Sequence, residues 1–340
     1  MAIFWNIFLK SFAIFISITT ILILGMLLLS LIDDQNKGDF IFLSGDKNSS
    51  NTIAVIELNG LIIEKNREFS DLANPFIISP SEIKYYLDNL KNINPKVIIF
   101  SINTPGGTVS ASKNIYNIIK NFKKNNNVEI LFHTNELLAS GGYWASTAAD
   151  RIYASYGSII GSIGVKGPDW FFYDQPKSIS TGLFGNKIDT KNGIKVFSNQ
   201  AGKSKDIFNP FRKPKKHELD HLQNMVNEIY NDFVRVVSKE RKIENDIIIN
   251  DIGALIYTSK QALKNHLIDG ELNLDDLIDR TSKQRDFKKY KVIKIHNQKN
   301  SLLREILTGN FFKSGINIKF ECLSLRSSIS AILSYQSTGC

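Results

Sequence analysis

The sequence is poor in the side chains that build disulfide frameworks and metal centres. Of its 340 residues only two are cysteines and five are histidines. Cys322 and Cys340 lie near the C-terminus without CxxC spacing, so they indicate neither a disulfide framework nor a zinc site, although the two thiols could pair with each other. The sequence has no HExxH motif and no clustered His, Cys and Asp residues, which disfavours metal catalysis.

The histidines also give little support to a Ser-His-Asp triad. His133 lies within a predicted strand, and His217 and His221 begin a predicted helix. We interpret each of them as an ordinary core or surface residue. A Gly-x-Ser-x-Gly motif, the usual nucleophile elbow of α/β-hydrolases, is not present around the candidate serine described below.

The net charge of +9 raises the question of a polyanionic partner. The lysines are scattered, and the sequence shows no RNP-like aromatic motif, zinc-ligand set or basic helix, so we expect no nucleic-acid binding. An anionic membrane surface is the better partner for this charge.

A long apolar run near the N-terminus predicts a transmembrane helix. Residues 11–32 contain no charged side chain, and 22 residues at about 1.5 Å each span roughly the hydrocarbon thickness of a bilayer. A cleaved signal peptide would have a shorter apolar core and an A-x-A-like site, which this run lacks. Lys10 precedes the run and Asp33 and Asp34 follow it, so we expect a single-pass cell-membrane protein with a cytoplasmic N-terminus and an extracytoplasmic domain.

The rest of the chain predicts one α/β domain. We divide the sequence into a membrane anchor (1–33), a polar linker (34–51), a catalytic domain (52–280) and a basic tail (281–340). Strands and helices alternate in the order strand 53–58, helix 80–90, strand 97–102, helix 111–122 and strand 128–134. Continuous apolar strands separated by helices predict a mostly parallel sheet, with ligands at the carboxyl ends of its strands.

Later segments are less regular. A small-residue helix is expected from 140 to about 149, and a strand with a short helix at 253–269. Residues 217–242 carry apolar side chains every three or four positions, as in a core-facing helix. The aromatic-rich insertion 167–194 fits either a flap or a satellite core under a long loop, and the pattern slightly favours the second.

Two glycine-bearing stretches follow predicted strand ends. Asn103-Thr104-Pro105-Gly106-Gly107 comes directly after strand 97–102, and Ala139-Ser140-Gly141-Gly142 follows a short apolar run. Such a turn pushes one hydroxyl into a cleft while its glycines let a substrate backbone come close. Alone, each stretch is more typical of an ordinary tight turn.

The ordered set of motifs resembles the signal peptide peptidase A family, the S49 serine peptidases, of the half-length, single-domain type. The resemblance covers about residues 52–275 and rests on the two stretches above and on Ala148–Ala154, Gly161-Ser162-Ile163-Gly164-Val165, Gly202-x-x-Lys205-Asp206 and Ile256-Tyr257-Thr258 with Ala262-Leu263. It implies a fold like that of Clp protease and crotonase, no cofactor, peptide substrates that include signal peptides, and a homo-oligomeric ring.

The resemblance also implies roles for individual residues. Ser140 matches the nucleophile and Lys205 the general base of a Ser–Lys dyad. Gly107 and Gly141 match the oxyanion hole, and Ser162 matches a serine that orients the lysine. Whether the dyad forms within one chain or between neighbours stays open.

Three departures from the family pattern stand out. Thr104 replaces a common serine, Asn265-His266 replaces a frequent glycine, and the interval between Ser140 and Lys205 is long. The long interval bears on the shape of the substrate cleft more than on the dyad.

The chemistry explains why these residue types belong together. A serine hydroxyl is a poor nucleophile until a base takes its proton, and a lysine can do so only when burial holds it neutral. Fixed backbone amides then stabilise the oxyanion of the tetrahedral intermediate. Lys203, two residues before Lys205, is the natural control.

Three functions therefore remain to be weighed. The residue set favours a membrane-anchored serine endopeptidase that degrades leftover signal peptides or other membrane-associated peptides through an acyl-enzyme. The alternative is a non-catalytic, peptide-binding scaffold of the same fold in a membrane complex. A crotonase-like acyl-CoA enzyme is a weaker idea because of the membrane anchor.

Overall fold

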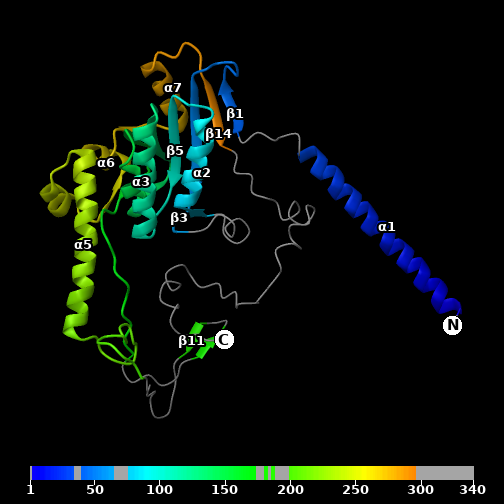
Figure 1. Ribbon diagram of the computed structural model, residues 1–340, viewed down its shortest axis with the longest axis horizontal. Helices are drawn as coiled ribbons and strands as arrows, with labels where there is room; N and C mark the ends of the chain where they lie inside the picture. Colours follow the sequence, from blue (N-terminus) through cyan, green and yellow to red (C-terminus); the bar gives the residue numbers. More distant parts are fainter. Residues whose placement is uncertain are drawn as a thin grey trace.

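The computed structural model describes residues 2–33, 40–64, 76–173, 180–182, 185–187 and 199–295 (Figure 1). Cys322, Cys340, His296 and most of the expected basic tail lie outside the described residues, as does much of the 167–194 insertion. Within that insertion the structure describes a short antiparallel hairpin of β10 (Ser180–Gly182) and β11 (Gly185–Lys187).

The N-terminal helix α1 covers Ala2–Asp33. Its segment Phe4–Gly25 is long and apolar enough to cross a membrane. The helix begins earlier than the uncharged run because Lys10 interrupts the apolar sequence without breaking the helix; lysine is a good helix former. The expected N-terminal apolar helix is therefore confirmed.

A seven-stranded sheet forms the centre of the domain, and its strand order is β1-β14-β2-β5-β6-β8-β13. All neighbouring pairs are parallel except β1 with β14, so the predicted mostly parallel α/β sheet is confirmed. The strands are β1 (Phe40–Gly45), β2 (Thr52–Asn59), β5 (Val97–Asn103), β6 (Glu129–Thr134), β8 (Arg151–Ala154), β13 (Gly270–Glu271) and β14 (Lys291–Ile295).

Both faces of this sheet are covered, which explains the continuous apolar runs of β2 and β5. One face packs into the larger core with helices α2 (Pro80–Lys91), α3 (Val109–Asn125), α4 (Gly141–Ser146) and α5 (Lys216–Arg241). The other face packs against α7 (Leu274–Gln284). The structure also contains α6 (Ser259–Lys264), a π-helical turn (Ile247–Ile252) and the short strand pair β3 (Leu61–Ile62) and β4 (Ile77–Ile78).

The sheet extends into both segments that flank the predicted domain. β1 lies within the expected linker 34–51, and β14 lies within the expected tail 281–340. β14 pairs with β1 on one side and with β2 on the other, so it is an interior strand. Its five residues, Lys-Val-Ile-Lys-Ile, bury Val292, Ile293 and Ile295, a run too short to stand out in a basic sequence.

The helix after Ser140 is shorter than expected. α4 ends at Ser146, whereas the sequence predicts a helix to about residue 149. The hydroxyls of Ser146 and Thr147 bond back to the carbonyl groups of Tyr143 and Trp144, at 2.8 and 2.7 Å. Such side-chain bonds compete with the helical backbone pattern and help to end the helix.

Apolar side chains of helix α5 enter the main core along its second half. Phe233 is buried and stacks on Trp144 with ring centroids 4.6 Å apart, and the Arg241 guanidinium pairs with Asp269 at 2.7 Å. Met225, in the first half of the predicted apolar stripe, is 47% exposed. The prediction of a core-facing position was therefore wrong for Met225, while Leu222 and Val226 are half-buried. The N-terminal end of the helix extends beyond the sheet in Figure 1.

His266 explains one departure from the family pattern. Its backbone has a φ of 57°, in the left-handed region that favours glycine, directly after α6. The position therefore has the conformation for which a glycine is the natural residue, although this chain places a histidine there.

Candidate active site

Ser140 occupies a sharp turn between β7 (Leu137–Ala139) and α4. Its φ and ψ are 53° and −125°, a combination that is strained for any residue with a side chain. The Ser140 amide donates to the Gly161 carbonyl at 2.9 Å, and its hydroxyl does not cap α4. The turn thus holds the hydroxyl free of the helix, as a nucleophile requires.

A three-stranded sheet supports this turn. β7 pairs in parallel with β9 (Ile159–Gly161), which pairs with β12 (Ile256–Thr258). Ala139 and Gly161 are partners in the register, so Ser140 and Ser162 both follow directly after paired strand ends. Ser162 also has a positive φ, of 53°, and its amide donates to the Leu255 carbonyl at 2.7 Å. The structure therefore brings Ser162 next to the Ser140 turn.

The Gly106-Gly107 turn packs against the Ser140 turn. A Cβ built on Gly106 would lie 2.9 Å from the Ser140 Cβ, and one on Gly141 would lie 3.4 Å from the Gly107 nitrogen. Gly106 leaves no room for a side chain, since real Cβ contacts almost never fall below 3.0 Å, and the Gly141 backbone lies against Gly107. The two glycine stretches, distant in the sequence, thus form one site.

The amides of Gly107 and Gly141 are candidates for the oxyanion hole. Gly107 forms a bridge with Ile62, but the bonds of that bridge use the Gly106 carbonyl and the Thr108 amide. Within the described part of the chain, neither the Gly107 nor the Gly141 amide donates a hydrogen bond. Two free, fixed amides next to a serine hydroxyl are what an oxyanion hole requires.

Further polar contacts fix the turn at residues 103–107. The Thr104 hydroxyl accepts from the Gly106 amide at 3.0 Å, and its methyl would lie 2.3 Å from a Cβ on Gly142. The Asn103 side chain accepts from the amides of Asn135 and Glu136, at 3.2 and 3.0 Å. Thr104 therefore does what a serine could do there and also fills the space above the double glycine.

Sequence reasoning missed Ser112. This residue of α3 is fully buried, and its hydroxyl donates to the Thr108 carbonyl at 2.9 Å. A Cβ on Gly141 would lie 2.1 Å from the Ser112 oxygen, so Ser112 closes the space behind the candidate oxyanion amide. Its spacing of four residues from Thr108 fits local back-bonding, but no sequence signal relates it to Gly141.

Tyr143, in α4, packs beneath the Ser140 turn in the protein core. Its ring is fully buried, its hydroxyl donates to the Leu267 carbonyl at 2.8 Å, and burial raises the pKa of this phenol. His133 is also buried, and burial lowers the pKa of its imidazole. Its Nε2 lies 3.1 Å from the Leu272 carbonyl, so the interpretation of His133 as a core residue agrees with its position.

Lys205 lies apart from these residues. It belongs to the turns that precede α5, where its amide donates to the Gly202 carbonyl at 3.3 Å, and its side chain is exposed. No hydrogen bond among the described residues joins it to the Ser140 turn. The structure brings Ser140, Gly107, Gly141 and Ser162 together, and it leaves Lys205 on a separate segment.

These features define an α/β protein. A candidate nucleophilic serine and free backbone amides lie in the turns that follow the carboxyl ends of β5 and β7. The family model for peptidase family S49 matches residues 122–288, which include Ser140, Ser162 and Lys205. Over these residues the chain belongs to peptidase family S49.

Relatives with protease names agree with this assignment. A candidate protease of Methanocaldococcus jannaschii is 34% identical over 192 residues, which are 55% of this chain and 57% of that protein. A candidate signal peptide peptidase SppA of Enterococcus faecium is 28% identical over 255 residues, 73% of this chain and 68% of the relative. Protease 4 of Haemophilus influenzae is 28% identical over 222 residues, 65% of this chain and 33% of the relative.

Solved structures of similar shape include two peptidases. A mutant of the 1510-N membrane-bound stomatin-specific protease in complex with a substrate peptide aligns with a TM-score of 0.43 at 16% identity, covering 76% of this chain and 98% of that chain. A ClpP1 mutant from Listeria monocytogenes aligns with a TM-score of 0.40 at 14% identity, covering 66% of this chain and 94% of that chain.

Proposed function

We propose that this protein is a membrane-anchored serine endopeptidase in which Ser140 is the nucleophile and Lys205 the general base. The observation that carries the proposal is the Ser140 turn, whose strained serine lies beside two amides that donate no other hydrogen bond within the described chain. Membership of a peptidase family supports the same reading.

The proposed reaction proceeds through an acyl-enzyme. The Ser140 oxygen attacks the peptide carbonyl carbon while its proton passes to the neutral Lys205 amine. The amides of Gly107 and Gly141 donate to the oxyanion, and the proton on Lys205 then passes to the departing amine as the peptide bond breaks. Water, activated by the same amine, hydrolyses the ester and frees Ser140.

Lys205 must reach a Ser140 hydroxyl away from solvent to act as this base. It is exposed in the single chain, and helix α5, which follows its segment, extends beyond the sheet (Figure 1). We propose that a homo-oligomer buries this segment and completes the site, with the amine supplied by the same chain or by a neighbour. Ser162 would then orient the amine, from its place beside the Ser140 turn.

The substrates follow from the anchor. Helix α1 contains a segment that can cross a bilayer, so the catalytic domain would work close to the membrane surface. We propose residual signal peptides and other membrane-associated peptides as substrates, with the N-terminus of the enzyme cytoplasmic and its domain extracytoplasmic.

Hydrolysis of a quenched fluorescent peptide with an apolar core, by the full chain in detergent, tests this function. We expect turnover by the wild type, none by Ser140→Ala or Lys205→Ala, and turnover close to wild type by the matched control Lys203→Ala. A folded wild-type oligomer that binds the peptide without cleaving it would support the peptide-binding scaffold instead.

Mixed oligomers decide which chain supplies the amine. Coexpression of the Ser140→Ala and Lys205→Ala chains would restore part of the activity if the dyad forms between neighbours, because one interface then holds both intact residues. If the dyad forms within one chain, the mixture stays inactive.

A further inference from the structure

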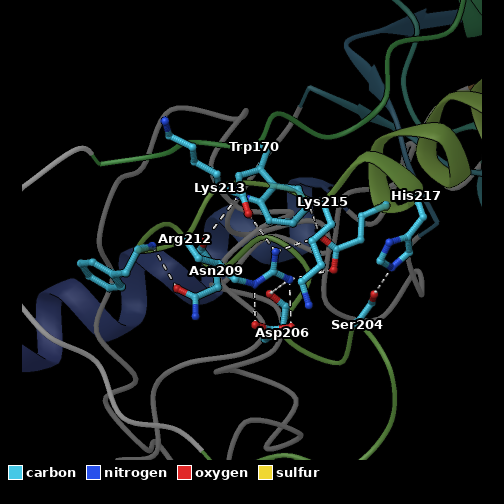
Figure 2. A network of polar contacts seen from close by, with 10 residues as sticks. Trp170, Ser204, Asp206, Asn209, Arg212, Lys213, Lys215 and His217 are labelled. Carbon is cyan, nitrogen blue, oxygen red and sulfur yellow. Dashed lines mark hydrogen bonds and ion pairs between the residues drawn. The ribbon is translucent and has the colours of Figure 1, made fainter.

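The segment that carries Lys205 is tied to helix α5 on both sides of the lysine. Before it, the Ser204 hydroxyl lies 3.0 Å from Nε2 of His217, in the first turn of α5. After it, the Asp206 carboxylate is held by Arg212 (Figure 2). The backbone around Lys205 is thus fixed, while no described contact holds its side chain.

Arg212 is the centre of this arrangement. Its Nε and Nη2 donate to the two oxygens of Asp206 at 2.5 and 2.9 Å, and Nη2 also donates to the Asp206 carbonyl at 3.2 Å. Nη1 and Nη2 donate to the two oxygens of Glu218, each at 2.8 Å. One guanidinium therefore joins the residue after Lys205 to the start of α5 with paired, directional bonds.

The burial of Glu218 makes the loss of Arg212 unfavourable. Its side chain is only 1% exposed, and its second role is to accept from the Lys215 amide at 2.9 Å, which caps α5. A buried carboxylate without its counterion is unfavourable, so loss of Arg212 would disturb both the cap and the turn.

Trp170 covers the guanidinium. The Arg212 guanidinium carbon lies 5.1 Å from the Trp170 ring centroid, and the indole nitrogen donates to the Asn209 carbonyl at 3.3 Å. Trp170 also contacts Phe208, with centroids 5.3 Å apart. The first residues of the 167–194 insertion are therefore packed against the lysine segment, as a satellite core.

The turn itself is strained and needs such ties. Ser204 and Phe208 have φ values of 61° and 68°, in the left-handed region that residues with side chains seldom adopt. Both lie within three residues of Lys205. A segment with this backbone stays in one conformation only when the surrounding contacts determine it.

We propose that Arg212 is a positioning residue for Lys205, holding the turn that presents the amine by joining Asp206 to Glu218 under Trp170. The inference rests on the proposed role of Lys205 as the base. The Arg212 guanidinium holds the pKa of Asp206 and of Glu218 at about 2, so the bonds stay charged at any pH where a peptidase of this kind would work. Arg212 acts through Lys205 and touches no substrate.

The test compares Arg212→Ala and Arg212→Lys with the matched control Arg235→Ala, an exposed arginine of α5 that pairs with Asp232. We expect Arg212→Ala to lower kcat at least about tenfold with KM changed less than about twofold, since a misplaced base slows chemistry more than binding. Because a poorly held amine is better hydrated, the pH at which kcat is half-maximal should also rise. Arg212→Lys should recover part of kcat, and Arg235→Ala should match the wild type.

A double variant separates this inference from the proposed function. In a Lys205→Ala chain, adding Arg212→Ala should leave the slow residual labelling of Ser140 by a fluorophosphonate probe unchanged, because Arg212 acts only through the lysine. If Lys205→Ala keeps wild-type activity, the proposed function fails. If Lys205→Ala is inactive while Arg212→Ala, folded and assembled, keeps the wild-type kcat and pH profile, only the positioning role is overturned.

Discussion

Gly106 packs directly against Ser140: a Cβ on Gly106 would lie 2.9 Å from the Ser140 Cβ and 2.8 Å from the Gly141 nitrogen. Gly106 also has a φ of 100°, which only glycine adopts readily. The contact aligns the Gly107 amide with the turn that carries the serine. The candidate oxyanion hole is therefore built from two loops that can pack this closely only because Gly106, Gly107 and Gly141 have no side chain.

The fit around Gly141 predicts a rescue. Gly141→Ala places a methyl 2.1 Å from the Ser112 oxygen, so the turn must move and we expect kcat to fall about a hundredfold, as when an oxyanion donor is lost. Adding Ser112→Gly removes that collision and should recover much of kcat, at a stability cost of about 1 kcal/mol for glycine within α3. Steady-state kinetics and thermal unfolding of the two variants measure both effects. Full activity of Gly141→Ala alone would contradict this account of the site.

The strain at Ser140 predicts that replacing this serine with glycine stabilises the protein while it abolishes activity. Its φ of 53° and ψ of −125° suit glycine, so Ser140→Gly should raise the free energy of unfolding by about 1 kcal/mol while abolishing activity. Ser140→Ala, which keeps a Cβ, should be inactive with little change in stability. Denaturant unfolding of the two variants measures the difference. A less stable Ser140→Gly protein would show that the turn is not strained.

Acid should open the bonds around Arg212 only at low pH. The pKa values of Asp206 and Glu218 are lowered to about 2, chiefly by hydrogen bonds from Arg212, against ordinary values of 3.8 and 4.5. Groups with lowered folded-state pKa values stabilise the fold above their ordinary pKa, and this stabilisation is lost as the pH falls toward 2. The difference in tryptophan fluorescence between wild type and Trp170→Phe should thus be constant at every pH above the ordinary Glu218 pKa of 4.5 and change only as the pH approaches about 2. A fluorescence change centred near pH 6 would contradict this account of the Arg212 bonds.

His266 offers a stabilising substitution. Because its φ is 57°, His266→Gly should relieve strain and raise the free energy of unfolding by about 0.5 to 1 kcal/mol. The Arg241 side chain bonds to the backbone carbonyl of this residue at 3.0 Å, a contact that glycine preserves. Asn265→Gly, one position earlier at a φ of −84°, is the matched control and should not stabilise the protein. Equal effects of the two changes would refute the explanation.

The sequence was sufficient to predict the elements whose signals are local. The apolar runs of β2 and β5 mark interior parallel strands, and the glycines at 106, 107 and 141 mark turns in which a side chain does not fit. Ser140 could be singled out because it follows a strand and precedes two glycines. In each case the sequence signal itself lies within a few residues.

Features that depend on distant partners could not be predicted. β14 becomes an interior strand because β1 and β2 lie on either side of it, and its short basic sequence gives no sign of them. Ser112 matters because Gly141 lies against it. Arg212 could not be singled out from the sequence, since its bonds to Asp206 and Glu218 require the fold of the turn.

Covalent labelling of the protein with a fluorophosphonate probe tests the dyad most directly. Mass spectrometry should locate the adduct on Ser140, with labelling of Lys203→Ala close to the wild-type rate and of Lys205→Ala reduced at least about a hundredfold, because an unactivated serine hydroxyl reacts slowly. Labelling of Ser140 at the wild-type rate in the Lys205→Ala protein would contradict the account.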